Sequence, residues 1–204
     1  MEFLKKKRVI MIFLVMFGVS ASAQITPSKV FETSYTKEAV GDYKGAINEI
    51  VGLNGFDYHK SLRLGWLYYL EKNYDESIRY YEQAIKLRPK AVEALLGLCN
   101  PLEAQKKNDL LETTYKKILA IDPTNTKVNY ALGNIYYYRK NFALAEKHFD
   151  LVVSLYPFDY YSNLMAGWTK YFLNKKSEAK ILFNTVLIIS PNDKSAREGL
   201  ALIK

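Results

Sequence analysis

Cysteine and histidine are scarce in this chain of 204 residues. Cys99 is the single cysteine, and His59 and His148 are the two histidines. One thiol cannot form a disulfide within the chain. Neither histidine has a partner at the i, i+4 spacing that places two metal ligands on one helix face. The composition therefore predicts no internal disulfide and no metal site.

Motifs that carry enzyme chemistry are also missing. The chain has no glycine-rich phosphate loop, no nucleophile elbow, and no pattern that joins a nucleophile to a histidine base. Carboxylates are present, but no apolar context singles out a pair of them. We therefore predict a protein that is not an enzyme and needs no cofactor.

Long hydrophobic runs are limited to one stretch near the start, Val9–Val19. This stretch is much shorter than the roughly 20 residues that a helix needs to cross a bilayer. Four basic residues, Lys5–Arg8, precede it, and Ala21–Ala23 follow it. This order is typical of a secretory signal peptide over residues 1–23, cleaved after Ala23. An exported bacterial protein of the periplasm is the expectation, and an uncleaved membrane anchor is the alternative.

Concentrated charge is absent from the rest of the chain. The formal net charge is +8, from 29 basic and 21 acidic residues, but the lysines are scattered and the only Lys-Lys-Lys run lies in the leader. A nucleic-acid-binding protein would need a basic stripe. We predict a mostly solvated basic surface and no nucleic-acid partner. A weak attraction to anionic lipid or glycan, and so a peripheral membrane association, stays open.

What the chain does contain is a strict internal repeat. Three columns of residues recur at one constant spacing without an insertion: Pro89, Pro123, Pro157 and Pro191; Gly65, Cys99, Gly133 and Gly167; and Tyr81, Tyr115, Phe149 and Phe183. Between them, apolar residues recur at helical spacing in two blocks per repeat. The pattern indicates two helices in every repeat.

Each column has a physical reason. Gly65 is small because the two helices of a repeat cross there, with Ser77 facing it, and Tyr81 is large because it fills the wedge between neighbouring repeats. Pro89 stops the second helix, since proline lacks the backbone N–H and clashes with the preceding turn. Cys99 occupies the small-residue column, so packing explains it. Asparagines are expected at the tight turn between the helices: Asn73, Asn108 and Asn141.

The chain thus resembles the tetratricopeptide repeat family, whose period of about 34 residues matches the spacing of these columns. The matching pattern includes "LRLGWLYY" from Leu62 and "NYALGNIYYYRKNFALAEKHF" from Asn129. The resemblance implies an all-α, right-handed solenoid of antiparallel helix pairs. We predict a degenerate repeat over 24–57, full repeats over 58–91, 92–125, 126–159 and 160–193, and a capping helix over 194–204.

The resemblance also implies a concave groove, lined by the first helix of each repeat, that holds a peptide or a helix of a partner. Both tryptophans fall in one inward column, three repeats apart, and tyrosine and tryptophan dominate binding hot spots. The alternative is that some of these aromatics only pack between adjacent first helices. The predicted groove residues are Trp66, Tyr69, Asn100, Lys127, Tyr130, Asn134, Tyr137, Tyr161, Trp168 and Tyr171.

Pro101 lies inside a predicted first helix, where proline removes a hydrogen bond. We interpret it as a kink that alters the curvature of the solenoid, and such a kink would also widen the groove beside Asn100.

The function favoured by these features is a scaffold that binds another envelope protein through its concave face. Two alternatives stay open. The protein could be a structural subunit that assembles through its convex face or its ends, which exposed Leu200, Leu202 and Ile203 would support. It could also be a glycan-binding or enzyme-associated module, because aromatic grooves stack on sugars as well.

Overall fold

The computed structural model describes residues 26–203, so the predicted leader over 1–23 lies outside the described residues. Within this range the chain forms eleven helices and no strand. The helices are α1 (Pro27–Ala39), α2 (Tyr43–Val51), α3 (Asp57–Leu70), α4 (Tyr74–Leu87), α5 (Val92–Ala104), α6 (Asn108–Ile121), α7 (Thr126–Tyr138), α8 (Phe142–Leu155), α9 (Tyr160–Phe172), α10 (Lys176–Ile189) and α11 (Lys194–Leu202). The predicted all-α class is confirmed.

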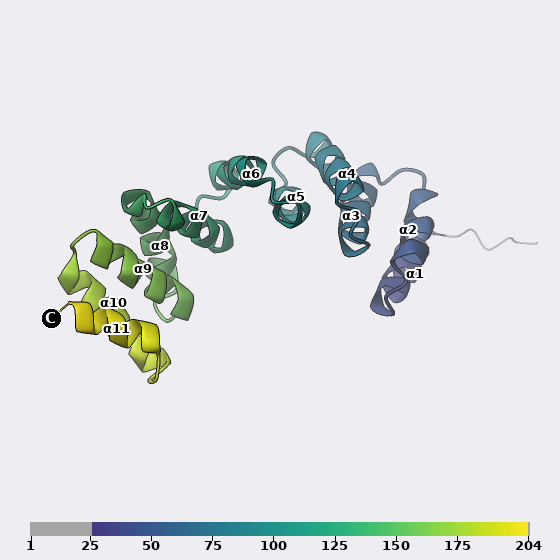
Figure 1. Ribbon diagram of the computed structural model, residues 1–204. Helices are drawn as coiled ribbons and strands as arrows, with labels where there is room; N and C mark the ends of the chain where they lie inside the picture. Colours follow the sequence, from purple (N-terminus) through teal and green to yellow (C-terminus); the bar gives the residue numbers. More distant parts are fainter. Residues whose placement is uncertain (1–25, 204) are drawn as a thin grey trace, which may run out of the picture.

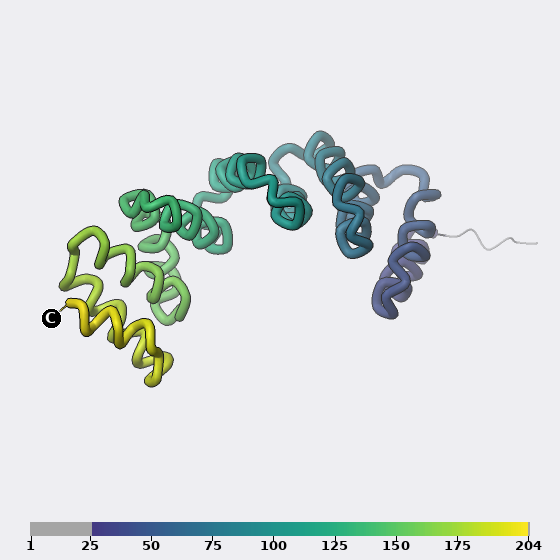
Figure 2. Tube along the Cα trace, viewed as in Figure 1, coloured from purple at the N-terminus to yellow at the C-terminus, as the bar shows by residue number. Residues whose placement is uncertain are grey.

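Successive helices pair and stack into an arch (Figure 1). The pairs are α1 with α2, α3 with α4, α5 with α6, α7 with α8, and α9 with α10, and α11 packs against the last pair. The first helices α3 and α5 lie on the inner side of the arch, and α4 and α6 lie on its outer side. The tube in Figure 2 shows the chain turning back within each pair and then stepping to the next one.

Aromatic rings seated on glycines hold neighbouring pairs together. The ring of Tyr81 packs so tightly on Gly65 of its own pair and Gly97 of the next that an added Cβ would stand 2.9 Å and 2.2 Å from it. Phe183 lies in the same way between Gly167 and Gly199 of α11. These contacts explain both the small and the large residues of the repeat pattern.

The turns within the pairs follow one conformation. Asn73 and Asn141 cap α4 and α8 with their side chains, as expected of turn asparagines. The prediction for Asn108 is wrong: it is the first residue of α6, and Lys107 takes the capping position without a side-chain hydrogen bond. The residue before each cap has a positive φ in the last four pairs, at Lys72, Lys106, Lys140 and Asn174.

Pro101 does not end its helix. α5 continues to Ala104, and the proline ring is buried. The hydrogen bond that proline cannot donate would have reached the carbonyl of Gly97, one turn earlier. The structure thus places Pro101 in the interior of the solenoid, next to the buried Leu102.

One lysine departs from the solvated surface expected for this residue type. Lys170 of α9 is buried, and its ammonium group lies 2.7 Å from carboxylate oxygens of both Glu146 and Asp150 and 2.9 Å from one of Glu178. Burial disfavours its charge, but the hydrogen bonds to the three carboxylates outweigh this and hold the pKa of Lys170 above its usual value.

His148 is half-buried between α7 and α8. Its Nδ1 lies 2.8 Å from Oδ1 of Asn129, whose amide group donates to the carbonyl oxygens of Pro123 and Asn125. Because the Asn129 oxygen can only accept, Nδ1 is the donor of this pair, and in the neutral ring Nε2 is then the unprotonated nitrogen. Burial, followed by the charge of Lys147, lowers the pKa of His148 below 6.5.

We expect the folded chain to lose stability as the pH falls below about 6.5 because of this histidine. The unfolded chain binds the proton first, so the free energy of unfolding falls until the pH passes the lower pKa of folded His148. One proton limits this effect to about 1.4 kcal/mol per pH unit. Urea unfolding near neutral and mildly acidic pH should show a smaller fall for His148→Gln. An equal fall in both proteins would contradict the assignment.

Candidate functional site

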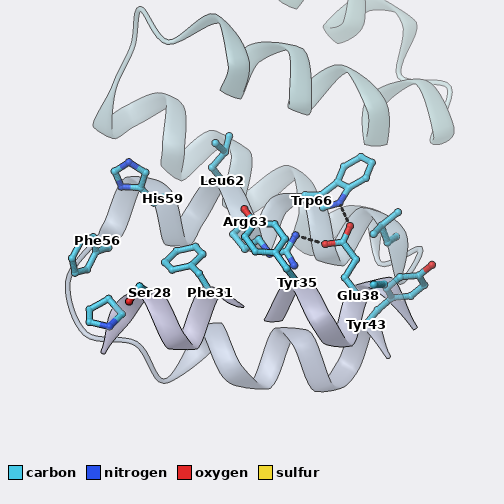
Figure 3. A pocket seen from close by; sticks show the side chains of 13 residues that line it. Ser28, Phe31, Tyr35, Glu38, Tyr43, Phe56, His59, Leu62, Arg63 and Trp66 are labelled. Atoms are coloured by element: carbon cyan, nitrogen blue, oxygen red, sulfur yellow. Dashed lines mark hydrogen bonds and ion pairs between the residues drawn. The ribbon is translucent and has the colours of Figure 1, made fainter. Parts of the chain in front are cut away.

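The largest of the hollows described on this surface lies at the N-terminal end of the arch, between the first helices α1 and α3. It has a volume of about 1150 Å³. Figure 3 shows side chains of both helices pointing into the space between them. The lining is mostly apolar and aromatic: Pro27, Ser28, Phe31, Tyr35, Glu38, Ala39, Tyr43, Phe56, His59, Leu62, Arg63, Trp66 and Leu70.

A polar network crosses the hollow and ties α1 to α3 (Figure 3). Arg63 of α3 forms an ion pair with Glu38 of α1 and donates to Oγ of Ser34 at 3.1 and 3.2 Å. The indole Nε1 of Trp66 donates to the same Glu38 carboxylate at 2.7 Å. The Arg63 guanidinium also lies 3.9 Å from the centre of the Tyr35 ring. Glu38 is therefore shared by one cation and one indole.

This network fixes the geometry of the hollow before any ligand arrives. Arg63 is only 6% exposed, and its charge is balanced by Glu38, so the floor of the hollow presents no net ionic charge. The hydrogen bond to Glu38 orients the Trp66 ring. Phe31 and Leu62 contribute apolar surface from opposite helices. Such a site suits an uncharged, apolar or aromatic side chain better than a charged group.

The repeats match known sequences. Sequence profiles described as tetratricopeptide repeat match residues 62–91 and 126–159. The chain contains tetratricopeptide repeats. Comparison with curated proteins found no match.

Solved structures share the TPR solenoid fold. A tetratricopeptide repeat protein from Parabacteroides merdae is 19% identical, with a TM-score of 0.71 over 86% of this chain and 71% of its own. MamA from Desulfovibrio magneticus is 15% identical, with a TM-score of 0.66 over 82% and 96%. YrrB, described as a TPR protein with an unusual peptide-binding site, is 14% identical, with a TM-score of 0.66 over 85% and 91%. At these identities the likeness shows the fold, and it confirms the predicted solenoid.

The predicted groove residues all lie on first helices of the TPR solenoid, but they do not share one hollow. Trp66 lines the hollow between α1 and α3, and Tyr69 lies beside it with 5.6 Å between the ring centres. Lys127, Tyr130 and Tyr161 line a smaller hollow of about 330 Å³ near the start of α7 and α9.

The remaining five lie elsewhere. Tyr137 lines a third hollow, of about 380 Å³, where α7 ends. Trp168 and Tyr171 belong to the apolar cluster beneath α11, where Trp168 donates to Oγ of Ser195 at 2.8 Å. Asn100 and Asn134 are half-buried and line none of these hollows. Trp66 and Trp168 thus occupy one sequence column but have different surroundings.

The residues of α1 that line the main hollow were not among the predicted groove residues. They can be recognised in the sequence by a repeat spacing slightly shorter than that of the later repeats. This shorter spacing relates Phe31 to Leu62, Tyr35 to Trp66, and Gly41, which ends the first turn with a positive φ, to Lys72. α2 is shorter than the other second helices, with 9 residues against 14 in α4, and this shortens the first repeat.

The single cysteine and the possible metal ligands bear on the chemical reactivity of the described part of the chain. Burial raises the pKa of the Cys99 thiol to about 12, and its Sγ–H donates to the carbonyl of Leu95 at 3.2 Å. Such a thiol is a poor nucleophile at neutral pH. Among residues 26–203, no three His, Cys, Asp or Glu side chains are placed to share a metal ion.

Proposed function

We propose that this protein is a non-enzymatic scaffold that binds a segment of a partner protein, with the hollow between α1 and α3 as its main contact. TPR proteins as a class bind other proteins or peptides. The observation that carries the proposal is the hollow itself: a prearranged, mostly apolar space of about 1150 Å³ between two first helices. The peptide-binding site named for YrrB supports it by analogy of fold.

The chemistry of the lining defines the partner segment. The floor is an internally balanced ion pair, and the walls are Phe31, Leu62 and the Trp66 ring. Tyr35 and Phe56 stand at the hollow with more than half of their surface exposed. A peptide or helix that inserts one or two large apolar side chains would bury these rings, and such burial commonly dominates binding energy.

The cellular setting is a further part of the proposal. The basic and apolar leader supports export, and so a partner in the bacterial envelope. Assembly through the ends has less support in the arrangement of α11. Leu200 and Ile203 pack against the cluster around Phe183, and Leu202 is the exposed one of the three.

A cross-linked pull-down from envelope extract tests the proposal, with residues 24–204 as bait. Trp66→Ala should lower recovery of the partner by at least about tenfold, as expected for a hot-spot residue. Phe158→Ala is the control, because this ring is 69% exposed in a loop far along the chain. Circular dichroism would verify that each bait keeps its helices.

The Trp168→Ala variant distinguishes binding at the hollow alone from binding along one long groove. Loss of the partner with Trp66→Ala alone supports the hollow between α1 and α3. Loss with both tryptophan variants supports one long groove that runs over all first helices. A partner retained by both variants would contradict the proposal and move the contact to the convex face or the ends.

A further inference from the structure

In the last three pairs, the turns between the two helices carry more basic than acidic residues, which departs from the even scatter of lysines expected from the sequence. Residues 105–110, 139–144 and 173–178, named the turn edge here, include six basic and two acidic residues. The corresponding turn of the preceding pair, 71–76, has one lysine and three acidic residues. The basic residues of the turn edge are Lys106, Lys107, Arg139, Lys140, Lys175 and Lys176.

Contacts between successive pairs show that these turns lie along one edge. Arg139 forms an ion pair at 2.5 Å with Glu112, in the second turn of α6. The rings of Phe142 and Phe172 stack with 4.7 Å between their centres, which joins the last two turns. Lys175 reaches Glu146 of the preceding pair at 2.6 Å.

Half of these cations have no acidic partner among the described residues. Lys107, Arg139 and Lys175 each lie within 4 Å of a carboxylate, at 3.9, 2.5 and 2.6 Å. Within residues 26–203, Lys106, Lys140 and Lys176 form no such ion pair, and all three are exposed. Lys106 and Lys140 recur at the same position of their turns, with φ of 56° and 58°. The free positive charge is therefore repeated from pair to pair.

Exposed apolar side chains accompany the free cations. Tyr138 is 77% exposed and Phe172 is 50% exposed, and Leu110 and Leu144 are exposed in the first turns of α6 and α8. Tyr138, Phe172 and Lys140 line a shallow hollow of about 380 Å³ together with Tyr137 and Phe142. Protruding aromatic rings and free lysines thus share this edge.

We propose that the turn edge docks the last three helix pairs on an anionic lipid bilayer. The free lysines would lie near the lipid phosphates, where each basic residue contributes about 1 kcal/mol. The ring of Tyr138, which carries a polar hydroxyl, would enter the interfacial region, and the apolar ring of Phe172 would enter beside it. The cations are spread over three separate turns and do not converge on one point. A surface with distributed negative charge matches this arrangement, and a single small anion does not.

The proposal concerns surface binding and leaves the hollow between α1 and α3 free, so it goes beyond the proposed function and can fail independently of it. None of the described helices is long and apolar enough to pass through a bilayer. The turn edge lies along α6–α10, whereas α1 and α3, which line the hollow, lie at the N-terminal end of the arch (Figure 1). A protein docked in this way could still receive a partner segment.

Vesicle co-sedimentation tests the docking, with phosphatidylcholine vesicles that contain or lack phosphatidylglycerol. The full chain and the form that begins at Gln24 are compared, because the second form lacks the basic, apolar leader but keeps every described helix. The triple variant Lys106→Gln, Lys140→Gln, Lys176→Gln should bind anionic vesicles on the order of a hundredfold more weakly. The matched control Lys90→Gln, Lys117→Gln, Lys194→Gln removes the same charge from exposed positions outside the turn edge.

An aromatic variant, added salt and three contrary results complete the test of membrane docking. Tyr138→Ser should weaken binding several-fold without a change in helicity, and added salt should weaken wild-type binding. Equal losses in the two triple variants would overturn the proposal, since general charge would then explain the binding. Absence of binding to anionic vesicles by the form from Gln24 would overturn it as well. Binding to heparin in place of vesicles would also overturn it and assign the edge to an anionic glycan.

Discussion

Phe149→Ala is expected to lower the free energy of unfolding by about 3–5 kcal/mol, the usual cost of emptying a buried phenylalanine site. Phe149 lies on α8 and is completely buried against α7 of its own pair and α9 of the next. Its ring contacts Tyr130 with 5.8 Å between ring centres and closes on Gly133. The loss would weaken the interface between two repeats, and solenoid stability is largely a sum of such interfaces. Urea unfolding followed by circular dichroism measures it.

The control for this prediction is Phe158→Ala, which removes the same ring from an exposed site. We expect a change within about 0.5 kcal/mol. A loss for Phe158→Ala as large as that for Phe149→Ala would contradict the burial argument.

Gly133 supplies an independent test of the same contact. A Cβ added there would stand 2.6 Å from Cε1 of Phe149, so Gly133→Ala should cost about 1–3 kcal/mol through overpacking. In the Phe149→Ala background, the added methyl group enters the vacated space and the substitution should become neutral or stabilising. A double-mutant cycle measures this coupling, and strict additivity would show that the ring and the glycine do not limit each other.

The fold could be predicted well from the sequence because the residues that pack the helix pairs together and end the helices recur at one constant spacing. Gly65, Tyr81 and Pro89 each do one local task that is repeated along the chain, so their roles are visible as columns. Asn108 shows the limit of this reasoning. It stands one position past the column of Asn73 and Asn141, and the column itself holds Lys107, which forms the turn without a side-chain cap. A turn conformation can thus persist where its most favoured residue is missing.

For the candidate site, the sequence predicted Trp66 of α3 but not its partners on α1, and the physical reason is a different one. Trp66 was expected on the inner face, but its partner Glu38 lies 28 residues earlier, in a repeat whose shortened second helix breaks the regular spacing. Pairings such as that between Arg63 and Glu38 join different helices and leave no periodic trace. Lys170 makes the same point, because nothing in its local sequence reveals that carboxylates from α8 and α10 surround it.

The ion pair at the floor of the hollow gives the second large prediction. Glu38→Ala should lower the free energy of unfolding by about 3 kcal/mol, since it leaves the buried Arg63 guanidinium without a countercharge. Ser34 and the Tyr35 ring would remain beside Arg63, and neither carries a negative charge. Trp66 would also lose its hydrogen-bond acceptor. Thermal unfolding and the emission of Trp66, measured in a Trp168→Phe background, report the two effects separately.

Glu32→Ala is the matched control, because it removes the same group from the same helix. Glu32 pairs with Lys29 at 3.0 Å, but both side chains are more than 60% exposed, so we expect a loss of at most about 0.5 kcal/mol. The double variant Glu38→Ala, Arg63→Met should recover most of the stability, since an apolar replacement of a whole buried pair is often tolerated. Without that recovery, the cost of Glu38→Ala would come from lost packing between α1 and α3 and not from a stranded charge. If the double variant is stable but the Trp66 emission stays altered, the carboxylate serves chiefly to orient the indole, and the hollow would depend on Glu38 for its shape more than for its stability.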